Sequence, residues 1–202
     1  MRKSGFTLLE LLIVIAILAI LAAAAVVVLN PAELLRRARD SERITDIANT
    51  RNALNLYLTT VGTPDLDGSS SCPTNYFTAL AQNDTTSSAN LNLAALVQTT
   101  TGTRVTDGTG WIPVNLNNTA GGSPLSALPV DPRNAVDVCT GGTGQNDCIY
   151  YYACSQGSST YELGANMEST EYGVSGGSDI ENTDGGNSTN WYEVGNDPGL
   201  NL

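Results

Sequence analysis

Residues 6–29, FTLLELLIVIAILAILAAAAVVVL, decide the fold of this chain, because they form one apolar run in which Glu10 is the only charge. A helix over this run would be roughly 36 Å long at about 1.5 Å per residue, which is enough to cross a bilayer. Arg2 and Lys3 precede the run and predict an N-terminus that stays in the cytoplasm. We therefore expect the rest of the chain to lie outside.

Two common explanations of such a run fit it poorly. A secretory signal peptide has an apolar region of about 7–15 residues followed by a small-residue cleavage site, and this run is longer, with no A-x-A pattern in a polar stretch beyond it. A plain membrane anchor leaves Glu10 unexplained, because a carboxylate in a spanning helix is costly and by default functional. The anchor stays open as an alternative, since Glu10 is one turn from the helix start and could reach the headgroups.

The residues around Glu10 carry a more specific pattern, KSGFTLLELLIVIAILAIL. It resembles the class III signal of bacterial type IV prepilins and type II secretion pseudopilins over about twenty-five residues. In that family a short basic leader ends in Gly, the mature chain starts at Phe, and its fifth residue is Glu; Gly5, Phe6 and Glu10 have these spacings. The resemblance implies that a prepilin peptidase cuts between Gly5 and Phe6 and methylates the new amine of Phe6.

Cleavage at this bond has a physical consequence for Glu10. The cut would leave the apolar helix on the mature chain, so that the anchor becomes a packing surface. The new ammonium of Phe6 would be a charge in apolar surroundings, which is costly unless it is paired. Glu10 of an adjoining subunit, or of the same chain, could neutralise it and fix the register between neighbours. We therefore predict that Glu10 is the assembly residue.

Asn30-Pro31 interrupts the apolar run. Pro31 has no N–H and clashes with the carbonyl four residues back, so we expect a helix kink there, as many members of the resembled family have. Alternatively, Pro31 begins a second helix at its first position. Both alternatives give two helical pieces in line.

Residues 32–60 predict an amphipathic helix, which Gly62 and Pro64 would end. Its charged side chains would face solvent or neighbouring subunits, and these two alternatives stay open. The predicted apolar stripe consists of Leu34, Leu35, Ala38, Ile44, Ile47, Ala48, Leu54, Leu58 and Val61. The predicted charged face consists of Arg36, Arg37, Arg39, Asp40, Glu42, Arg43 and Asp46.

Beyond the helix the chain is rich in Thr, Ser, Asn and Gly. The clearest predicted strands are Ile149–Cys154 and Thr160–Ala165, joined by a turn, and 111–115 is a weaker one. We expect short helices at 76–81 and 91–99. These strands suit a small antiparallel sheet laid over the amphipathic helix.

The sequence from Leu128 to Ser169, which contains LPVDPRN and IYYYACSQGSSTYELGA, resembles the head of pilins and pseudopilins. The expected fold class is therefore α+β, a long kinked N-terminal helix packed against a small antiparallel-sheet head, the type IV pilin fold. We expect a leader at 1–5, a transmembrane or filament-core helix at 6–30, an amphipathic helix at 31–61 and an extracellular globular head at 62–202.

The four cysteines indicate disulfides better than a metal site. The number is even, no C-x-x-C spacing occurs and the chain has no histidine, all of which argue against zinc. An exported domain of this composition fits two disulfides, with free thiols as the alternative. Three pairings are open, and we prefer Cys139 with Cys148, which closes a Gly-rich loop, and Cys72 with Cys154.

The turn-rich tail contains side-chain oxygens that could gather around Ca²⁺, which takes 6–8 such ligands. The candidates are Asp179, Glu181, Asn182, Asp184 and Asn187. This tail resembles the acidic C-terminal loop that holds calcium in pseudopilins of the major type. The spacing is not that of an EF-hand, and clusters of Gly, Asp and Asn ordinarily form plain turns.

The charge distribution and the missing residue types exclude several functions. The net charge is −11, and beyond residue 51 only Arg104 and Arg133 oppose fifteen acids, which disfavours direct nucleic-acid binding. Without histidine there is no Ser-His or Cys-His catalysis, and no Gly-rich phosphate loop occurs. We expect a structural protein and not an enzyme.

The resemblance and these features predict a structural subunit of an extracellular helical filament, a type IV pilus-like major pilin. It would form a homo-oligomer after processing by prepilin peptidase, with help from an inner-membrane assembly machinery. The precursor would reside in the inner membrane and the product on the cell surface. The alternatives are a type II secretion pseudopilin, or a minor pilin acting as a tip adhesin or a DNA-uptake module.

Overall fold

The computed structural model describes residues 5–68, 72, 76–78, 96–98, 103–133 and 148–200. The chain divides into two compact units, Met1–Arg36 and Arg37–Leu202. The boundary falls within the second helix, because most of that helix packs with the C-terminal part of the chain.

The N-terminal unit contains helix α1 (Leu8–Leu29) and the first residues of helix α2 (Pro31–Thr60). Between them Asn30 takes a left-handed conformation, with φ 38° and ψ 73°. Pro31 is the first residue of α2, where its missing N–H has no helical partner to lose. The predicted pair of helical pieces is confirmed: the long N-terminal helix bends at Asn30, and Pro31 is the first residue of its second piece.

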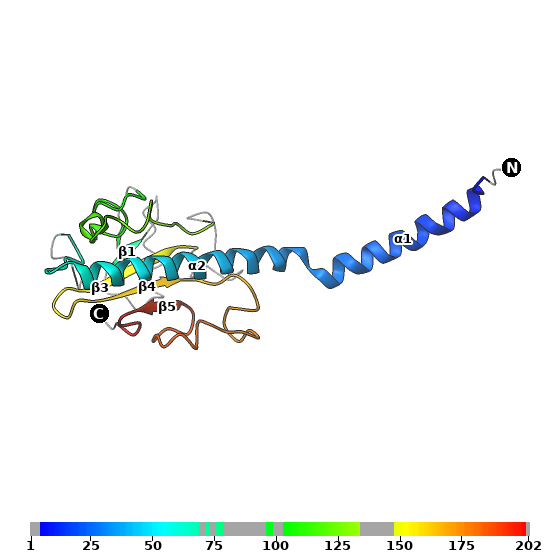
Figure 1. The fold of residues 1–202 in the computed structure, drawn as a ribbon. Coiled ribbons are helices and arrows are strands. Elements are labelled where there is room, and N and C mark those ends of the chain that lie inside the picture. Colours follow the sequence, from blue (N-terminus) through cyan, green and yellow to red (C-terminus); the bar gives the residue numbers. More distant parts are fainter. Residues whose placement is uncertain are drawn as a thin grey trace. The chain divides into compact units, whose positions relative to one another are not determined.

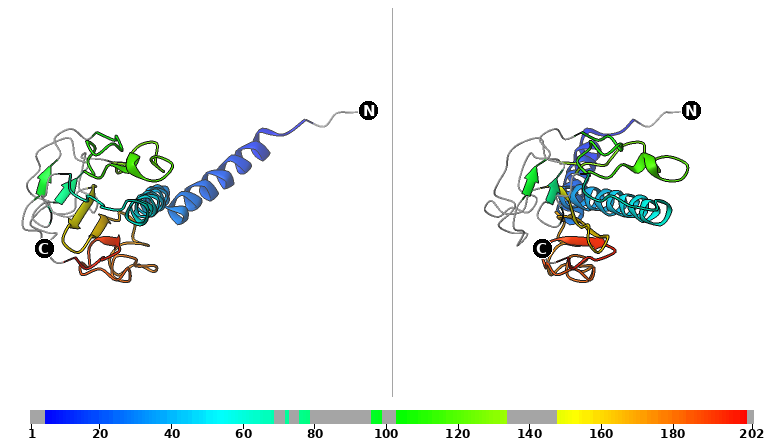
Figure 2. Two further views of the ribbon diagram at one scale, coloured as in Figure 1. Left: turned by 60° about the vertical axis from the view of Figure 1, so that its left-hand side comes forward. Right: turned by 90° about the vertical axis from the view of Figure 1, so that its left-hand side faces the viewer.

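The second unit places the rest of α2 against a five-stranded sheet in the order β2-β1-β3-β4-β5 (Figures 1 and 2). Strands β1, β3, β4 and β5 pair antiparallel, and β2 lies parallel to β1 at the edge. The strands are β1 (Tyr76–Thr78), β2 (Leu96–Gln98), β3 (Tyr150–Ser155), β4 (Thr160–Ala165) and β5 (Tyr192–Gly195).

The two strands predicted most clearly are confirmed as β3 and β4, and Figure 1 shows them beside α2. The short helices predicted at 76–81 and 91–99 are wrong for the residues that the structure describes, because these form strands β1 and β2. The other residues of the two segments lie outside the described part of the chain. Pairing of Phe77 with Tyr152 of β3 overrides the weak helical spacing.

Two further differences concern the C-terminal half. The segment 111–115 is not a strand; its backbone makes one isolated bridge, between Asp107 and Asn115, yet Trp111 is fully buried. Strand β5 lies in the tail, for which the sequence predicts only turns. Its residues Tyr192, Glu193 and Val194 alternate as strand residues do.

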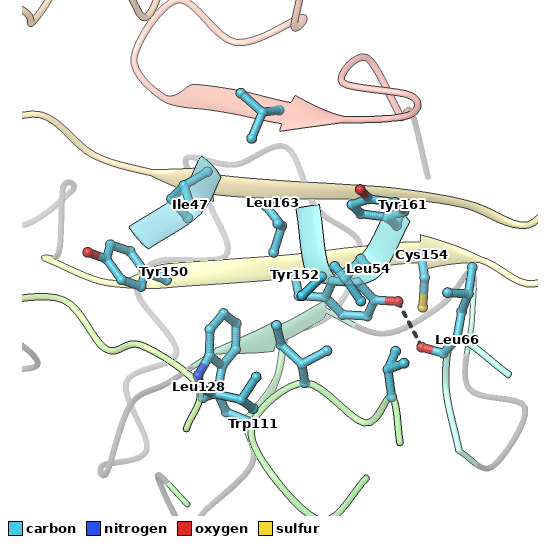
Figure 3. Packing of buried hydrophobic residues seen from close by; sticks show 14 of the residues in the cluster. Ile47, Leu54, Leu66, Trp111, Leu128, Tyr150, Tyr152, Cys154, Tyr161 and Leu163 are labelled. Carbon is cyan, nitrogen blue, oxygen red and sulfur yellow. Dashed lines mark hydrogen bonds between the residues drawn. The ribbon is translucent and has the colours of Figure 1, made fainter. Parts of the chain in front are cut away.

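One hydrophobic core lies between α2 and the sheet (Figure 3). Ile47 and Leu54 of α2 pack with Tyr152 and Leu163. These two strand residues point to the same face because they lie directly opposite each other on β3 and β4. The Tyr152 hydroxyl donates to the carbonyl of Leu66 at 2.9 Å, so its one polar atom is satisfied in the core. The predicted stripe is confirmed in this part of α2.

Leu34 and Leu35, which open the predicted stripe, are 52% and 62% exposed. Both precede the C-terminal unit, so they lie before the part of α2 that carries the core. For these two residues, and for Ala38, which is also exposed, the predicted burial is wrong.

A disulfide joins Cys72 to Cys154 of β3, with 5.4 Å between the Cα atoms, in agreement with the preferred pairing. It ties the segment after α2 to the sheet across 82 residues of sequence. Cys148 is also disulfide-bonded, and Cys139, its preferred partner, lies outside the described residues.

Candidate functional site

The first turn of α1 holds Glu10 in a capping box with Thr7. The Glu10 N–H donates to the Thr7 hydroxyl at 3.2 Å. In return, the Thr7 N–H and hydroxyl donate to Glu10 Oε2 at 2.9 and 2.8 Å. The carboxylate therefore satisfies donors that a helix start leaves without partners.

This use of Glu10 was missed in the sequence, although Thr7-Leu8-Leu9-Glu10 is the T-x-x-E pattern of a capping box. The box turns the carboxylate back toward the N-terminal end of the helix, where Phe6 precedes the cap. Glu10 thus has a partner in its own chain, and its placement is set by local helix chemistry.

The bond between Gly5 and Phe6 lies outside the helix. Phe6 is 83% exposed, and a Cβ added at Gly5 would meet nothing within 4 Å. Neither residue belongs to a regular element, because α1 begins only at Leu8. The bond is therefore accessible, and substitutions at Gly5 leave the fold undisturbed.

Helix α1 is apolar around its whole circumference. None of its residues is buried within the chain; Leu8 is 82% exposed and Ile13, in its second turn, 49%. Its 22 residues span roughly 33 Å, close to the thickness of a bilayer core of about 30 Å. By length and composition the helix could cross a membrane. A helix that is hydrophobic on all sides needs an apolar environment from lipid or from other proteins.

The C-terminal unit contains a second charged site, which the sequence did not predict. Arg43 of α2 is fully buried and binds three carboxylates. Its Nε and Nη2 donate to the two oxygens of Asp131 at 2.6 and 2.9 Å. Its Nη1 donates to Asp40 Oδ1 at 2.7 Å, and Nη2 also reaches Glu168 Oε1 at 2.5 Å. We call Asp40, Arg43, Asp131 and Glu168 the Arg43 cluster.

Glu168 extends the Arg43 cluster toward the surface. Arg39 donates to both of its oxygens, at 3.0 and 2.6 Å, and Arg133 lies 3.3 Å away. Burial by itself would raise the pKa of Glu168, but hydrogen bonds from Arg39 and Arg43 lower it to about 2. Burial would lower the pKa of Arg43, but the hydrogen bonds and charges of Asp131 and Glu168 hold it above its ordinary value. Together with Arg39 and Arg133, three cations thus face the three carboxylates of the cluster.

Asp40 also fixes the chain that follows β4. Its two carboxylate oxygens accept the backbone N–H groups of Glu168 and Ser169, at 2.9 and 2.8 Å. The helix and the segment after the sheet are therefore joined by both charge and backbone contacts. For Asp40 and Arg43 both predicted roles of the charged face, solvent contact and subunit contact, are wrong, because the head buries them.

The calcium candidates have other uses in the structure. Asp179 accepts the N–H groups of Ser175 and Asn182, and Asp184 accepts those of Gly186 and Glu193. The contacts to Ser175, Asn182 and Gly186 are local side-chain turns of the kind that Asp commonly forms, and the contact to Glu193 joins Asp184 to β5. Glu181 is buried and accepts the N–H of Met167. The backbone N–H of Asn187 binds Glu193. Within the described ranges, no group of three or more His, Cys, Asp or Glu side chains could hold a metal ion.

Residues 1–26 match the family model of the prokaryotic N-terminal methylation motif. No curated protein and no solved structure matches the chain. The matched residues include Gly5, Phe6 and Glu10, so the motif covers the exposed bond and the capping box described above. With the apolar helix behind it, this signal is that of a membrane-anchored precursor. The matched signal and the α+β arrangement of the chain support its resemblance to the type IV pilins and pseudopilins.

Proposed function

We propose that the chain is a structural subunit of an extracellular helical filament, a type IV pilus-like major pilin. Cleavage by prepilin peptidase between Gly5 and Phe6 and methylation of Phe6 precede assembly. Copies of α1 then leave the membrane and pack against one another in the filament core. The signal points to a structural protein and not to an enzyme.

The observation that carries this proposal is the full exposure of α1 in a chain whose head is already folded. The C-terminal unit has its own core and disulfide, so it does not need α1 for burial. About 25 cal/mol is gained for each Å² of apolar surface removed from water, and α1 exposes such surface on every side. Lipid covers it in the precursor, and neighbouring copies of α1 cover it in the filament.

Glu10 guides the assembly step in this proposal. After cleavage, the Phe6 ammonium stands one residue before Thr7, whose N–H and hydroxyl already bind Glu10. Inside an apolar helix bundle the ammonium requires a counter-charge, and Glu10 of an adjoining subunit supplies it. The open, head-to-tail symmetry of a helical filament gives every subunit such a neighbour.

Glu10→Gln separates the capping role from the charge-pairing role. The glutamine amide oxygen still accepts from Thr7, so α1 keeps its start, but the counter-charge is lost. We expect normal cleavage and membrane insertion, with filament yield in the sheared cell-surface fraction reduced at least tenfold. Glu10→Asp, which keeps the charge on a shorter side chain, should retain more filaments than Glu10→Gln.

Glu42→Gln is a matched control, because it removes the same charge from an exposed position of α2. Its filament yield should equal that of the unmodified chain. Wild-type yield from Glu10→Gln would reduce Glu10 to a helix cap and contradict its assembly role. Absence of the chain from sheared filaments, with normal expression, would contradict the assignment as a major pilin.

A further inference from the structure

The face of the sheet that points away from α2 carries a buried acidic group around Tyr151. Tyr151 of β3 lies over Gly164 of β4, where any side chain would collide with its ring. Trp191 packs edge-on against the same ring, with centroids 5.4 Å apart. Glu162 of β4 and Glu193 of β5 approach the Tyr151 hydroxyl from two sides. We call Tyr151, Glu162 and Glu193 the Tyr151 cluster; all three are buried.

The hydrogen bonds of the Tyr151 cluster lack one proton. Tyr151 Oη lies 2.6 Å from Glu162 Oε1 and 3.0 Å from Glu193 Oε1, but a phenol has a single proton to donate. The other oxygens are already satisfied, because Leu200 N–H donates to Glu162 at 3.1 Å and Ser188 N–H donates to Glu193 at 2.8 Å. With both carboxyls ionised, one of the two short contacts to Tyr151 would join two acceptors.

Among the residues that the structure describes, no positive charge takes the place of the missing proton. The nearby charges are negative: Asp197 raises the pKa of Glu162, and Asp184 raises the pKa of Glu193. Among the ion pairs of the described residues, none reaches either glutamate. The backbone of Gly186 lies close to the Glu193 carboxylate, where an added Cβ would collide with it.

We propose that Glu162 and Glu193 share one proton through Tyr151 in the folded head, so that one of the two carboxyls is neutral at neutral pH. The neutral carboxyl donates to the phenol oxygen, and the phenol donates to the remaining carboxylate. This arrangement gives each short contact its own proton. It joins β3, β4 and β5 and, through Leu200, the end of the chain.

The shared proton makes the head sensitive to alkaline pH. Burial and the charge of Glu193 raise the pKa of Glu162 from an ordinary 4.5 to about 8, and burial also raises the pKa of Glu193. The unfolded chain therefore releases this proton first as pH rises. The resulting stability is complete below about pH 4.5 and is lost as pH rises toward 8.

Equilibrium unfolding of the full chain in mild detergent, followed between pH 7 and 8, tests this inference. One extra proton held by the folded state raises the unfolding equilibrium constant by up to tenfold per pH unit. Glu162→Gln places a permanent N–H donor beside Tyr151 and should reduce this rise, leaving the part that Glu181 contributes through its own raised pKa of about 7. Glu42→Gln should keep the full rise. Should Glu162→Gln fail to fold, Glu193→Gln serves the same purpose.

Two outcomes would overturn the proposal. One is an equal rise of the unfolding equilibrium constant between pH 7 and 8 in the wild type and in Glu162→Gln. The other is stabilisation of the wild type, but not of the variant, by millimolar Ca²⁺ above pH 7, which would assign the missing positive charge to a cation. A direct measurement is the infrared C=O band of a protonated carboxyl at pH 7. It should persist in Glu181→Gln, which removes the other buried carboxyl whose pKa is raised to about 7, and disappear when Glu162→Gln is added.

Discussion

Replacing Arg43 by methionine tests the physical role of the Arg43 cluster. Methionine has a similar length and no charge, so the change removes the cation and leaves Asp40, Asp131 and Glu168 facing one another in the interior. In the folded chain the guanidinium makes hydrogen bonds of 2.5–2.9 Å to all three carboxylates. Their mutual repulsion and their missing hydrogen bonds then destabilise the head.

The magnitude follows from the complete burial of Arg43. Removal of one partner from a buried ion pair typically costs about 3–5 kcal/mol, mainly because the other charge is left without a partner. For a domain of roughly 150–250 residues, each kcal/mol lowers the melting temperature by about 2–4 °C. We therefore expect Arg43→Met to lower the melting temperature by roughly 6–20 °C.

Thermal unfolding of the full-length protein in detergent, followed by circular dichroism, measures this shift. Arg37→Met is the matched control, since Arg37 lies 3.4 Å from Glu171 and both side chains are partly exposed, at 44% and 32%. Such a surface pair contributes about 0–1 kcal/mol. If Arg43→Met shifted the melting temperature no more than Arg37→Met does, the reasoning from the buried network would be refuted.

Two more predictions concern the head. Because the pKa of Glu168 lies near 2 when folded and near 4.5 when unfolded, stability of the order of 3 kcal/mol should be lost as pH falls from about 4.5 to 2. Glu168→Gln should make the free energy of unfolding, measured by urea titration, nearly constant over this pH range. An unchanged loss of stability in the variant would show that other carboxyls cause it. Gly164→Ala should destabilise the head by about 1–3 kcal/mol, because its methyl group collides with the ring of Tyr151. In the Tyr151→Ala background, Gly164→Ala should destabilise the head less than it does in the wild type. Equal destabilisation in both backgrounds would contradict the collision between the two side chains.

The elements that could be predicted from sequence are those with local and dense signals. The apolar run at 6–29 gives α1, and Pro31 gives the break before α2. Strands β3 and β4 follow from aromatic and β-branched residues around a turn. The T-x-x-E pattern at Thr7 also carried local information, and it would have given Glu10 its capping partner.

The Arg43 cluster could not be predicted in the same way. Asp131 and Glu168 lie 88 and 125 residues beyond Arg43, and only the folded sheet brings them together. On a helical wheel Arg43 is simply one more charge on a charged face. Its burial follows from the fit of α2 onto the head, and that fit is a property of the tertiary structure.

The same argument applies to the short strands and to the acidic tail. β1 and β2 are three residues long, and their pairing with β3 and with each other decides their conformation over their own helical spacing. In the tail, the sequence shows many oxygens but not which backbone N–H groups they meet. Asp179 and Asp184 accept from turns, a use that composition alone does not distinguish from metal binding.

Mass spectrometry of the chain recovered from sheared cell-surface filaments tests the central claim most directly. The account predicts a mature N-terminus at Phe6 carrying one methyl group, with α1 retained. It also predicts that Gly5→Leu, which leaves the fold undisturbed, keeps the leader and stays out of the filament fraction. A mature chain that begins after Leu29, or a filament subunit that still carries Met1–Gly5, would contradict the account.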